Sequence, residues 1–213
     1  MQHSIIKAII VLIYTREGHS LAQWQLSGGE TESIGDSALF GIITVSDRAS
    51  KGEYEDEGGP AILGFFAEAI NSPWQAHYRC VPDEVPAIKE AIIELADEVG
   101  CSVIVTTGGT GPAIRDVTPE ATEAVCERIL PGFGEQMRAI SLKFVPTAIL
   151  SRQIGGTRGK SIIFNLPGRP KAIRETIDEL WRAVPYGVDL LDGPYIDCNP
   201  QICDAFRPKS ARR

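Results

Sequence analysis

The chain of 213 residues is long enough for one sizeable hydrophobic core, because a chain of this size buries roughly 70% of its unfolded surface. Its 43% apolar and 23% charged residues exclude the disordered, collagenous and coiled-coil classes. The formal net charge is −7, so the chain lacks the basic excess that would neutralise a run of nucleic-acid phosphates. Nucleic acid is therefore not an expected partner, although local cations and backbone amides could still bind a small anion.

The cysteine and histidine contents argue against two kinds of site. The five cysteines are an odd number without C-x-x-C spacing, which argues against a disulfide framework. The three histidines lie in no metal-ligand cluster, which argues against a zinc or iron centre. A required metal would be held by carboxylates and substrate phosphates, a ligand set that suits magnesium.

The N-terminal part of the chain has little periodicity. Its longest apolar run, Ile9 to Tyr14, is far shorter than the roughly 20 residues that span a bilayer. No convincing signal-peptide cleavage site follows this run, so we expect a cytoplasmic protein that does not enter a membrane. Residues 1–38 are expected to be an extension, either disordered or the product of a mis-assigned start codon. Residues 39–213 are expected to form a single domain.

From residue 39 onward, short β-branched runs alternate with segments of helical period. Strands are predicted at 39–45, 76–81, 102–107 and, as two extended pieces around a turn at 155–157, within 147–164. Helices are predicted after Gly59-Pro60, over 86–99, from Thr118 as N-cap toward residue 130, over 133–144 and over 170–181. This alternation predicts an α/β fold of three layers, α/β/α, with a mostly parallel central sheet.

Polar and glycine-rich segments follow the predicted strands, where parallel sheets bind their ligands. They are 46–48, 82–84, 108–112 and 165–168. In the third, Gly108, Gly109 and Gly111 could let the backbone approach an anion and present N–H groups to it. The spacing matches neither common phosphate-binding fingerprint, and a tight turn that needs positive φ is the alternative. Arg115 and Asp116, between this turn and the next helix, favour the anion site.

Most of these polar residues also have a purely structural interpretation. Asp116 and Asp83 could cap the helices that follow them. We favour a functional role for Asp116, and the spacing leaves both interpretations open for Asp83. The others could be turn, surface or strand residues that satisfy backbone groups: Ser46, Asp47, Arg48, Arg115, Ser151 and Asn165.

Several segments together resemble one known family. They are TVSDRASKGEYEDEGGPA (44–61), VPDE (81–84), TTGGTGPAIRDVTPEAT (106–122), PGFGEQMR (131–138), LSRQ (150–153) and NLPG (165–168). Their order and spacing are similar to those of the bacterial MogA-type molybdopterin adenylyltransferases, and the resemblance covers residues 40–213 almost continuously. The join 181–186 looks shorter than in the family, which leaves the number of C-terminal strands open.

The resemblance implies a MogA/MoaB-like fold and a magnesium-dependent nucleotidyl transfer. AMP would pass from ATP to the terminal phosphate of molybdopterin, giving adenylyl-molybdopterin and pyrophosphate, before molybdate is inserted. Family members are usually homotrimers, and a molybdenum insertase of the MoeA type would take the product.

The resemblance also implies roles for individual residues. Asp83 and Asp116 would be catalytic, with Asp116 on the magnesium side and Asp83 orienting the pterin or its attacking phosphate. The nucleotide phosphates would face Thr107, Gly108, Gly109, Thr110, Gly111 and Arg115. The pterin pocket would be lined by Ser46, Asp47, Ser151, Asn165, Pro167 and Gly168.

Two other functions remain as alternatives. A MoaB-like protein could carry the pterin without adenylylating it, and ATP-dependent AMP transfer distinguishes the two. A CinA-like domain acting on nucleotide metabolites is disfavoured, because such chains lack the segments at 131–138, 150–153 and 165–168. A structural scaffold would leave the four polar turns unexplained.

Overall fold

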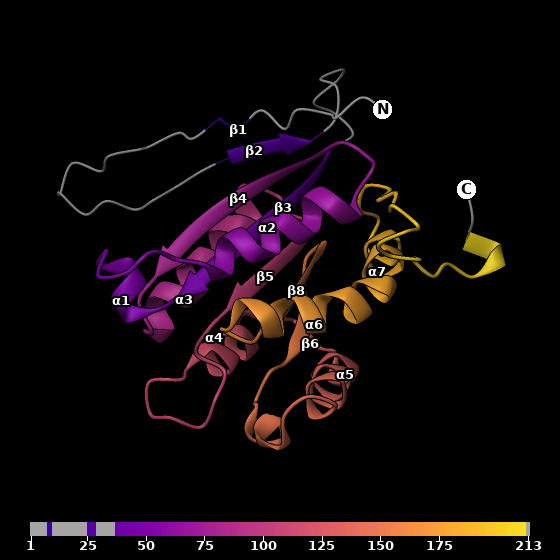
Figure 1. Cartoon of the computed structure of the whole chain (residues 1–213). Coiled ribbons are helices and arrows are strands. Elements are labelled where there is room, and N and C mark those ends of the chain that lie inside the picture. Colours follow the sequence, from indigo (N-terminus) through magenta and orange to yellow (C-terminus); the bar gives the residue numbers. More distant parts are fainter. Residues whose placement is uncertain (1–7, 10–24, 29–36, 212–213) are drawn as a thin grey trace.

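The computed structural model describes residues 8–9, 25–28 and 37–211 of the chain (Figure 1). Within these residues, eight strands form one sheet in the order β1-β2-β4-β3-β5-β8-β7-β6. The four central strands are parallel: β4 (Trp74–Val81), β3 (Ala38–Val45), β5 (Val103–Thr107) and β8 (Ser161–Leu166). The flanking strands are antiparallel to their neighbours: β1 (Ala8–Ile9), β2 (Gln25–Gly28), β6 (Arg128–Ile129) and β7 (Gly155–Arg158).

Helices cover both faces of the sheet, which confirms the predicted three-layer α/β fold. One face carries α2 (Gly58–Ala69), α5 (Pro131–Leu142), α6 (Pro170–Leu180) and α7 (Val184–Leu190). The other carries α3 (Val85–Ile93) and α4 (Thr118–Val125). Because side chains alternate along a strand, Phe40 and Ile42 of β3 enter the first layer while Ile43 and Val45 enter the second.

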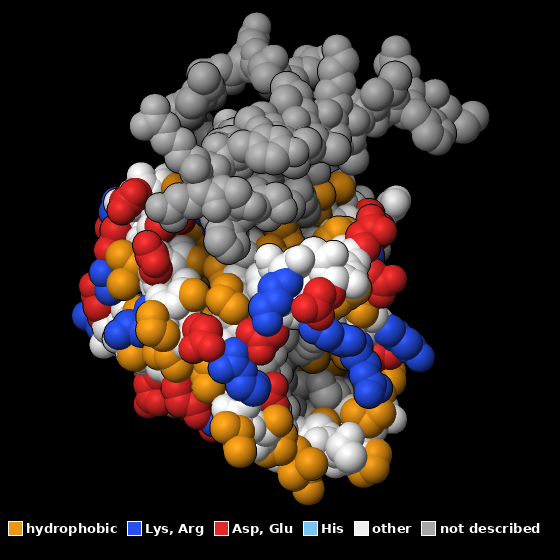
Figure 2. All heavy atoms as spheres, turned by 90° about the vertical axis from the view of Figure 1, so that its left-hand side faces the viewer, with side chains coloured by type: hydrophobic (Ala, Val, Ile, Leu, Met, Phe, Trp, Pro, Cys, Tyr) orange, Lys and Arg blue, Asp and Glu red, His pale blue; other side chains and the backbone are white. Residues whose placement is uncertain are grey.

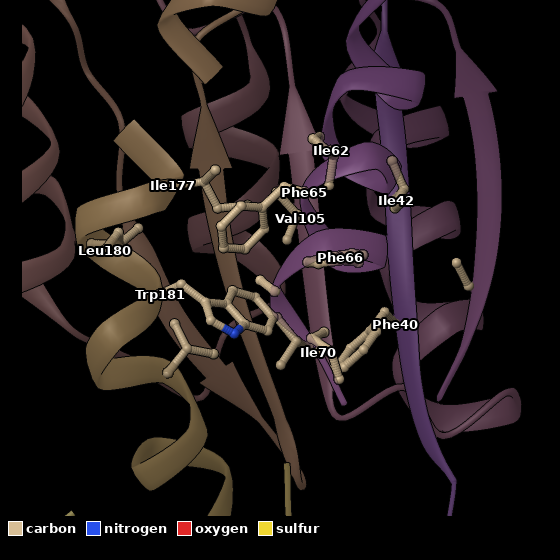
Figure 3. Close-up of a cluster of buried hydrophobic side chains, with 14 of the residues drawn as sticks. Phe40, Ile42, Ile62, Phe65, Phe66, Ile70, Val105, Ile177, Leu180 and Trp181 are labelled. Atoms are coloured by element: carbon tan, nitrogen blue, oxygen red, sulfur yellow. The ribbon is translucent and has the colours of Figure 1, made fainter. Parts of the chain in front are cut away.

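An aromatic cluster forms the centre of the first layer (Figure 3). The Phe66 ring lies 4.8 Å from that of Phe40 and 5.0 Å from that of Trp181, centroid to centroid. Phe65 meets Trp181 edge to face at 5.6 Å. These rings join α2, β3 and the end of α6, and all are fully buried. The cluster therefore fixes α2 against the sheet, with its first turn at the carboxyl ends of the strands.

The helix predicted from Thr118 toward residue 130 is shorter than expected. Val117 is the N-cap, and Thr118 is the first helical residue, so the prediction of Thr118 as N-cap is wrong. Its hydroxyl donates instead to the carbonyl oxygen of Gly108 at 2.9 Å. The helix ends at Val125, and the chain then forms the short strand β6 against β7.

The prediction of a turn at 155–157 is also wrong. Gly155 and Gly156 lie within β7, and the hairpin to β8 turns at Gly159, whose φ is +52°. The glycines of β7 serve close packing, because a Cβ at Gly155 would lie 2.6 Å from Phe133. Before β7, residues Pro146–Leu150 form a 3₁₀ helix where extended chain was expected.

The remaining predictions concern the ends of elements and the N-terminal extension. The helix predicted over 86–99 consists of α3 followed by a π-helical turn, Glu94–Glu98. After α6, the join passes through a 3₁₀ turn, Trp181–Ala183, directly into α7. Of the expected extension, only β1, β2 and residues 37–38 are described, and the rest lies outside the described residues. In the part of the chain that the structure describes, no helix is long and apolar enough to cross a membrane.

We expect Phe66→Ala to destabilise the fold by about 3–5 kcal/mol, because it removes a fully buried ring and leaves a cavity between α2 and β3. Phe206→Ala makes the same chemical change at a side chain that is 66% exposed, and should change the free energy of unfolding by no more than about 0.5 kcal/mol. Urea unfolding followed by circular dichroism measures both. An equal decrease in the free energy of unfolding of the two variants would contradict this description of the core.

Candidate functional site

Four turns meet at the edge where the parallel strands end. Val45 of β3 pairs with Val81 of β4, Thr44 with Thr107 of β5, and Thr107 with Leu166 of β8. The segments that follow these strands therefore leave the sheet side by side. Figure 2 views the molecule from this side, where acidic and basic side chains are interspersed.

A pocket of about 430 Å³ opens between these turns. Thr107, Gly108 and Gly168 line one part of it, and Asp47 and Asp83 line another. The remainder of its wall comes from the end of β3, α1 (Asp47–Ser50), the segment before α2 and the start of α6: Thr44, Val45, Ser46, Arg48, Tyr54, Asp56, Glu57, Gly58 and Pro170. Residues from all four polar segments that follow the predicted strands thus line this pocket.

The glycine-rich turn is held against the ends of β3 and β8. Gly108 has φ +99°, and a Cβ there would lie 2.3 Å from the carbonyl oxygen of Val45. Gly109 has φ +61°, and its Cβ would lie 2.5 Å from Thr118 Oγ1. Both the positive φ and the close approach therefore require glycine. On the other side, Thr107 Oγ1 donates to the Pro167 carbonyl at 2.8 Å, which holds the turn after β8 beside it.

Asp47 and Asp83 are linked by reciprocal hydrogen bonds. The Asp47 backbone N–H donates to Asp83 Oδ2 at 2.7 Å, and the Asp83 N–H donates to Asp47 Oδ1 at 3.2 Å. Burial raises the pKa of Asp83 above its ordinary value, and the negative charges of Asp47 and Asp116 add to this. Asp83 is thus the carboxylate of this pair that is more ready to accept a proton.

Arg115 bridges the carboxylates at the mouth of the site. Its guanidinium donates to both oxygens of Asp47, with Nη2 2.8 Å from Oδ1, and to Glu84 Oε1 at 2.8 Å. These hydrogen bonds hold the pKa of Asp47 below its ordinary value and raise that of Arg115. The guanidinium is half exposed, so an incoming phosphate can compete for it.

Asp116 lies on the far side of the glycine-rich turn. Its Oδ2 accepts from the Ala113 N–H at 2.9 Å, and a Cβ on Gly111 would lie 2.8 Å from the same oxygen. Within the described residues, neither Asp83 nor Asp116 caps the helix that follows it, so the capping interpretation is wrong for both. Asp116 instead shapes its own loop and keeps Oδ1 available.

The other predicted pocket residues differ in accessibility. Ser46 caps α1, accepting from the Ala49 N–H at 3.3 Å, and lies 3.2 Å from the Tyr54 hydroxyl. Asn165 is fully buried, and its side-chain N–H groups donate to Thr106 and Thr122 hydroxyls. Its side chain therefore ties β8 to β5 and α4. Ser151 Oγ donates to Gln153 Oε1 at 2.7 Å, behind the glycine-rich turn.

Arg152 is a site residue that sequence reasoning missed. Its Nε donates to the Gly111 carbonyl at 2.8 Å, its Nη2 donates to the Asp116 carbonyl, and its Nη1 pairs with Glu120. The Arg152 backbone N–H donates to the Thr110 carbonyl at 2.9 Å. One side chain thus fixes the loop from 110 to 116. An arginine inside the LSRQ segment is the available signal, but its partners are distant in sequence.

Asp56 is a second residue at the pocket that sequence reasoning missed. Its carboxylate accepts hydrogen bonds from the hydroxyls of Thr44 and Tyr78 and from the N–H groups of Gly58 and Gly59, at 2.7 to 2.9 Å. It fixes the first turn of α2 against β3 and β4 at the wall of the pocket. The D-x-G-G-P pattern at 56–60 is a local signal that could have identified Asp56 as an acceptor for the first N–H groups of this helix, whose N-cap is Glu57.

The donor set suits magnesium better than a transition metal. Among the residues that the structure describes, no group of three or more His, Cys, Asp or Glu side chains could enclose a metal. Mg²⁺ needs only one or two carboxylates, because water and substrate phosphates supply its other ligands. Asp83 and Asp116 fit that requirement, since the charge of Asp116 is near enough to raise the pKa of Asp83.

Comparisons with known proteins agree on one family. Residues 41–186 match the domain described as "Probable molybdopterin binding domain". The chain is 54% identical over 170 residues to the molybdopterin adenylyltransferase of Helicobacter pylori strain J99, covering 80% of this chain and 97% of that protein. It is 52% identical over 186 residues to the protein of the same name from Haemophilus influenzae, covering 82% and 94%.

Solved structures agree with this result. The molybdopterin biosynthesis enzyme MoaB from Thermus thermophilus aligns with a TM-score of 0.68 at 40% identity, covering 74% of this chain and 99% of that chain. The molybdopterin biosynthesis Mog protein from Mycobacterium ulcerans aligns with a TM-score of 0.66 at 37% identity, covering 73% and 99%. The fold is therefore that of the MoaB and Mog proteins.

The pKa values of Asp47 and Asp83 are predicted to be shifted in opposite directions, and one substitution should raise both. Asp83 should titrate above, and Asp47 below, the ordinary aspartate value of 3.8. Arg115 lowers the pKa of both, so Arg115→Gln should raise both. Carbon-13 NMR titration of the carboxyl carbons measures each value. As a matched control, Arg158→Gln should raise only the pKa of Asp97. An unchanged pKa of Asp47 in the Arg115→Gln variant would contradict the network.

Proposed function

We infer the function from one premise: the chain belongs to the family of molybdopterin-binding domains that act in molybdenum cofactor biosynthesis. We propose that it is a molybdopterin adenylyltransferase, a nucleotidyltransferase that moves AMP from ATP to the terminal phosphate of molybdopterin. The products are adenylyl-molybdopterin, ready for molybdate insertion, and pyrophosphate. The observation that carries this proposal is the identity of more than half of the aligned residues to relatives of that name.

The reaction is a phosphoryl-type displacement at the α-phosphorus of ATP. An oxygen of the pterin phosphate forms a bond to this phosphorus, and the bond to the oxygen bridging to the β-phosphate breaks. Pyrophosphate takes the electron pair. Because both reactants are anions, the protein must chiefly position them and neutralise their charge.

The glycine-rich turn is suited to the triphosphate. Its backbone lies at the pocket without side chains at 108 and 109, so an anion can approach its N–H groups closely. Arg115, released from Asp47 and Glu84 by a competing phosphate, would add a bidentate cation. Arg152 acts as a positioning residue, since it holds the loop that carries Arg115 and Asp116.

We assign the two catalytic aspartates different roles. Asp83 lies in the pocket with a raised pKa, which suits a carboxylate that orients the pterin phosphate and accepts its remaining proton. Asp116, with Oδ1 available, is proposed as the magnesium-side carboxylate. When bound there, Mg²⁺ would neutralise phosphate charge as a Lewis acid.

The oligomeric state, the location and the downstream partner are proposed from the family. We propose a homotrimer, a cytoplasmic location where ATP is available, and a MoeA-type molybdenum insertase that takes the product. The exposed apolar side chains between the end of α5 and the 3₁₀ helix support association of subunits, because a folded chain rarely exposes a contiguous apolar patch without a partner. They are Leu142, Phe144, Val145, Ile149 and Leu150.

Asp83→Asn and Asp116→Asn should each lower the rate of AMP transfer by at least about 10²-fold, because the first removes the proposed proton acceptor and the second the proposed magnesium ligand. The measurement follows pyrophosphate release and adenylyl-molybdopterin by chromatography, with purified protein, molybdopterin, ATP and Mg²⁺. Asp97→Asn removes an exposed carboxylate paired with Arg158 and serves as the matched control, with activity unchanged.

Two results would count against these assignments. An active Asp83→Asn/Asp116→Asn double variant would remove both residues from catalysis. If the wild-type protein binds the pterin and leaves ATP intact, the protein is a carrier of the MoaB-like kind, and the transferase proposal is wrong.

Sedimentation equilibrium should give a mass near three times the chain mass of 23.1 kDa. Ile149→Asp places a charge in the apolar patch at a side chain that is 69% exposed, so it should weaken association without disturbing the core. Leu190→Asp, at a side chain that is 66% exposed on α7, should leave the mass unchanged. A wild-type monomer at all concentrations would contradict the trimer.

A further inference from the structure

Cys198 and Cys203 lie together in the C-terminal segment, on the layer of α2 and α7. Both side chains are buried, with 9% and 2% of their surface exposed. They line the same surface pocket, of about 260 Å³, with Tyr195, Asp197 and Arg207 among its other walls. The two cysteines therefore share the wall of one surface pocket, at a place that the proposed AMP transfer does not use.

The backbone brings the two cysteines together. Cys198 pairs as an isolated bridge with Ile70, and the next residue, Asn199, donates its N–H to the Ala69 carbonyl at 2.8 Å. The chain then turns, with the Cys203 N–H donating to the Asn199 carbonyl at 2.8 Å. This anchored turn allows the thiol of Cys203 to hydrogen-bond the sulfur of Cys198.

The indole of Trp181 supplies a second, independent observation. Its Nε1 is fully buried and, within the described residues, makes no hydrogen bond. The Trp181 indole is one of the groups that lower the pKa of the Cys198 thiol. A buried donor without a conventional acceptor is costly, and a thiolate accepts far better than a thiol. Figure 3 shows the Trp181 ring locked among Phe65, Phe66 and Ile70, so this donor has little freedom to turn away.

The groups around the two cysteines shift the pKa values of their thiols in opposite directions. The hydrogen bond from Cys203, the Trp181 N–H and the positive charge of Arg207 lower the pKa of the Cys198 thiol, although burial and Asp197 oppose them. The same hydrogen bond raises the pKa of Cys203, which remains the protonated partner. This combination of a nucleophilic thiolate and a resolving thiol is the arrangement of redox-active cysteine pairs.

Cys80, Cys101 and Cys126 differ from Cys198 in the direction in which their pKa is shifted. Burial raises the pKa of Cys80 to about 11, of Cys101 to about 12 and of Cys126 to about 11. Such thiols are poor nucleophiles near neutral pH. Cys198 is thus distinguished by its neighbours as well as by its position.

We propose that Cys198 and Cys203 form a redox-active dithiol that exchanges with low-molecular-weight disulfides entering the pocket beside Arg207. The Cys198 thiolate attacks one sulfur of the external disulfide, whose S–S bond breaks and releases one thiolate. Cys203 loses its proton to solvent and attacks the Cys198 sulfur, which expels the second external thiolate. The two protein thiols are oxidised to a disulfide, and the external disulfide is reduced to two thiols.

The test uses the reduced full-length protein and glutathione disulfide, with acid quenching, alkylation and mass spectrometry. The wild type should lose two hydrogen atoms per chain, with peptides containing Cys198 and Cys203 linked to each other, and dithiothreitol should reverse the change. Cys203→Ser should instead accumulate one glutathione on Cys198. Cys198→Ser should react at Cys203 at least about tenfold more slowly than the wild type reacts at Cys198.

Cys126→Ser is the matched control and should form the Cys198–Cys203 disulfide at the wild-type rate. Thermal unfolding by circular dichroism confirms that each variant is folded, and alkylation of the folded wild type by iodoacetamide gives an independent ranking of the five thiols. The proposal is overturned if Cys80, Cys101 or Cys126 is alkylated first. It is equally overturned if the wild type stops at a mixed disulfide with glutathione.

Discussion

The sheet edge that carries the proposed active site depends on one backbone contact that only glycine permits. Gly108 lies so close to the end of β3 that any Cβ would overlap the Val45 carbonyl oxygen, and its φ of +99° is unfavourable for other residues. This contact draws the turn after β5 across the end of its neighbouring strand. Gly168, after β8, then packs against Gly108, with 3.4 Å between its would-be Cβ and the Gly108 Cα. The pocket is the space that these close approaches leave in front of α2.

The charge balance at this edge supports the proposal that a cation accompanies the substrates. Asp47, Asp83, Glu84 and Asp116 stand around the glycine-rich turn, while Arg115 is already paired with two of these carboxylates. The guanidinium of Arg152 is occupied by backbone carbonyls and Glu120, so it supports the loop more than it offers charge to a ligand. Two polyanionic reactants would therefore meet an excess of negative charge. Magnesium, held by a carboxylate and by the phosphates themselves, is the simplest remedy.

Local patterns predicted the four central parallel strands, the three layers and the segments that meet at the edge, because each depends on periodicity or on the rule for parallel sheets. The sequence could not show what a side chain meets across the fold. Asn165 follows the pattern of a turn residue, yet it is buried among Thr106 and Thr122. The glycines of β7 suggest a turn, but they make room for Phe133 and Cys126. The partners of Arg152 lie more than thirty positions away, beyond any motif.

Trp181 shows how one residue can serve two parts of the molecule. Its ring completes the aromatic cluster that sets α2 against the sheet, and α2 carries Gly58 and Gly59, which bind Asp56 at the pocket. Its indole also helps to lower the pKa of the Cys198 thiol in the C-terminal segment. The direct passage from α6 into α7 keeps Trp181 in this position, because a 3₁₀ turn continues the chain without an intervening strand. Trp181 thus connects the C-terminal segment to the core that positions the wall of the pocket.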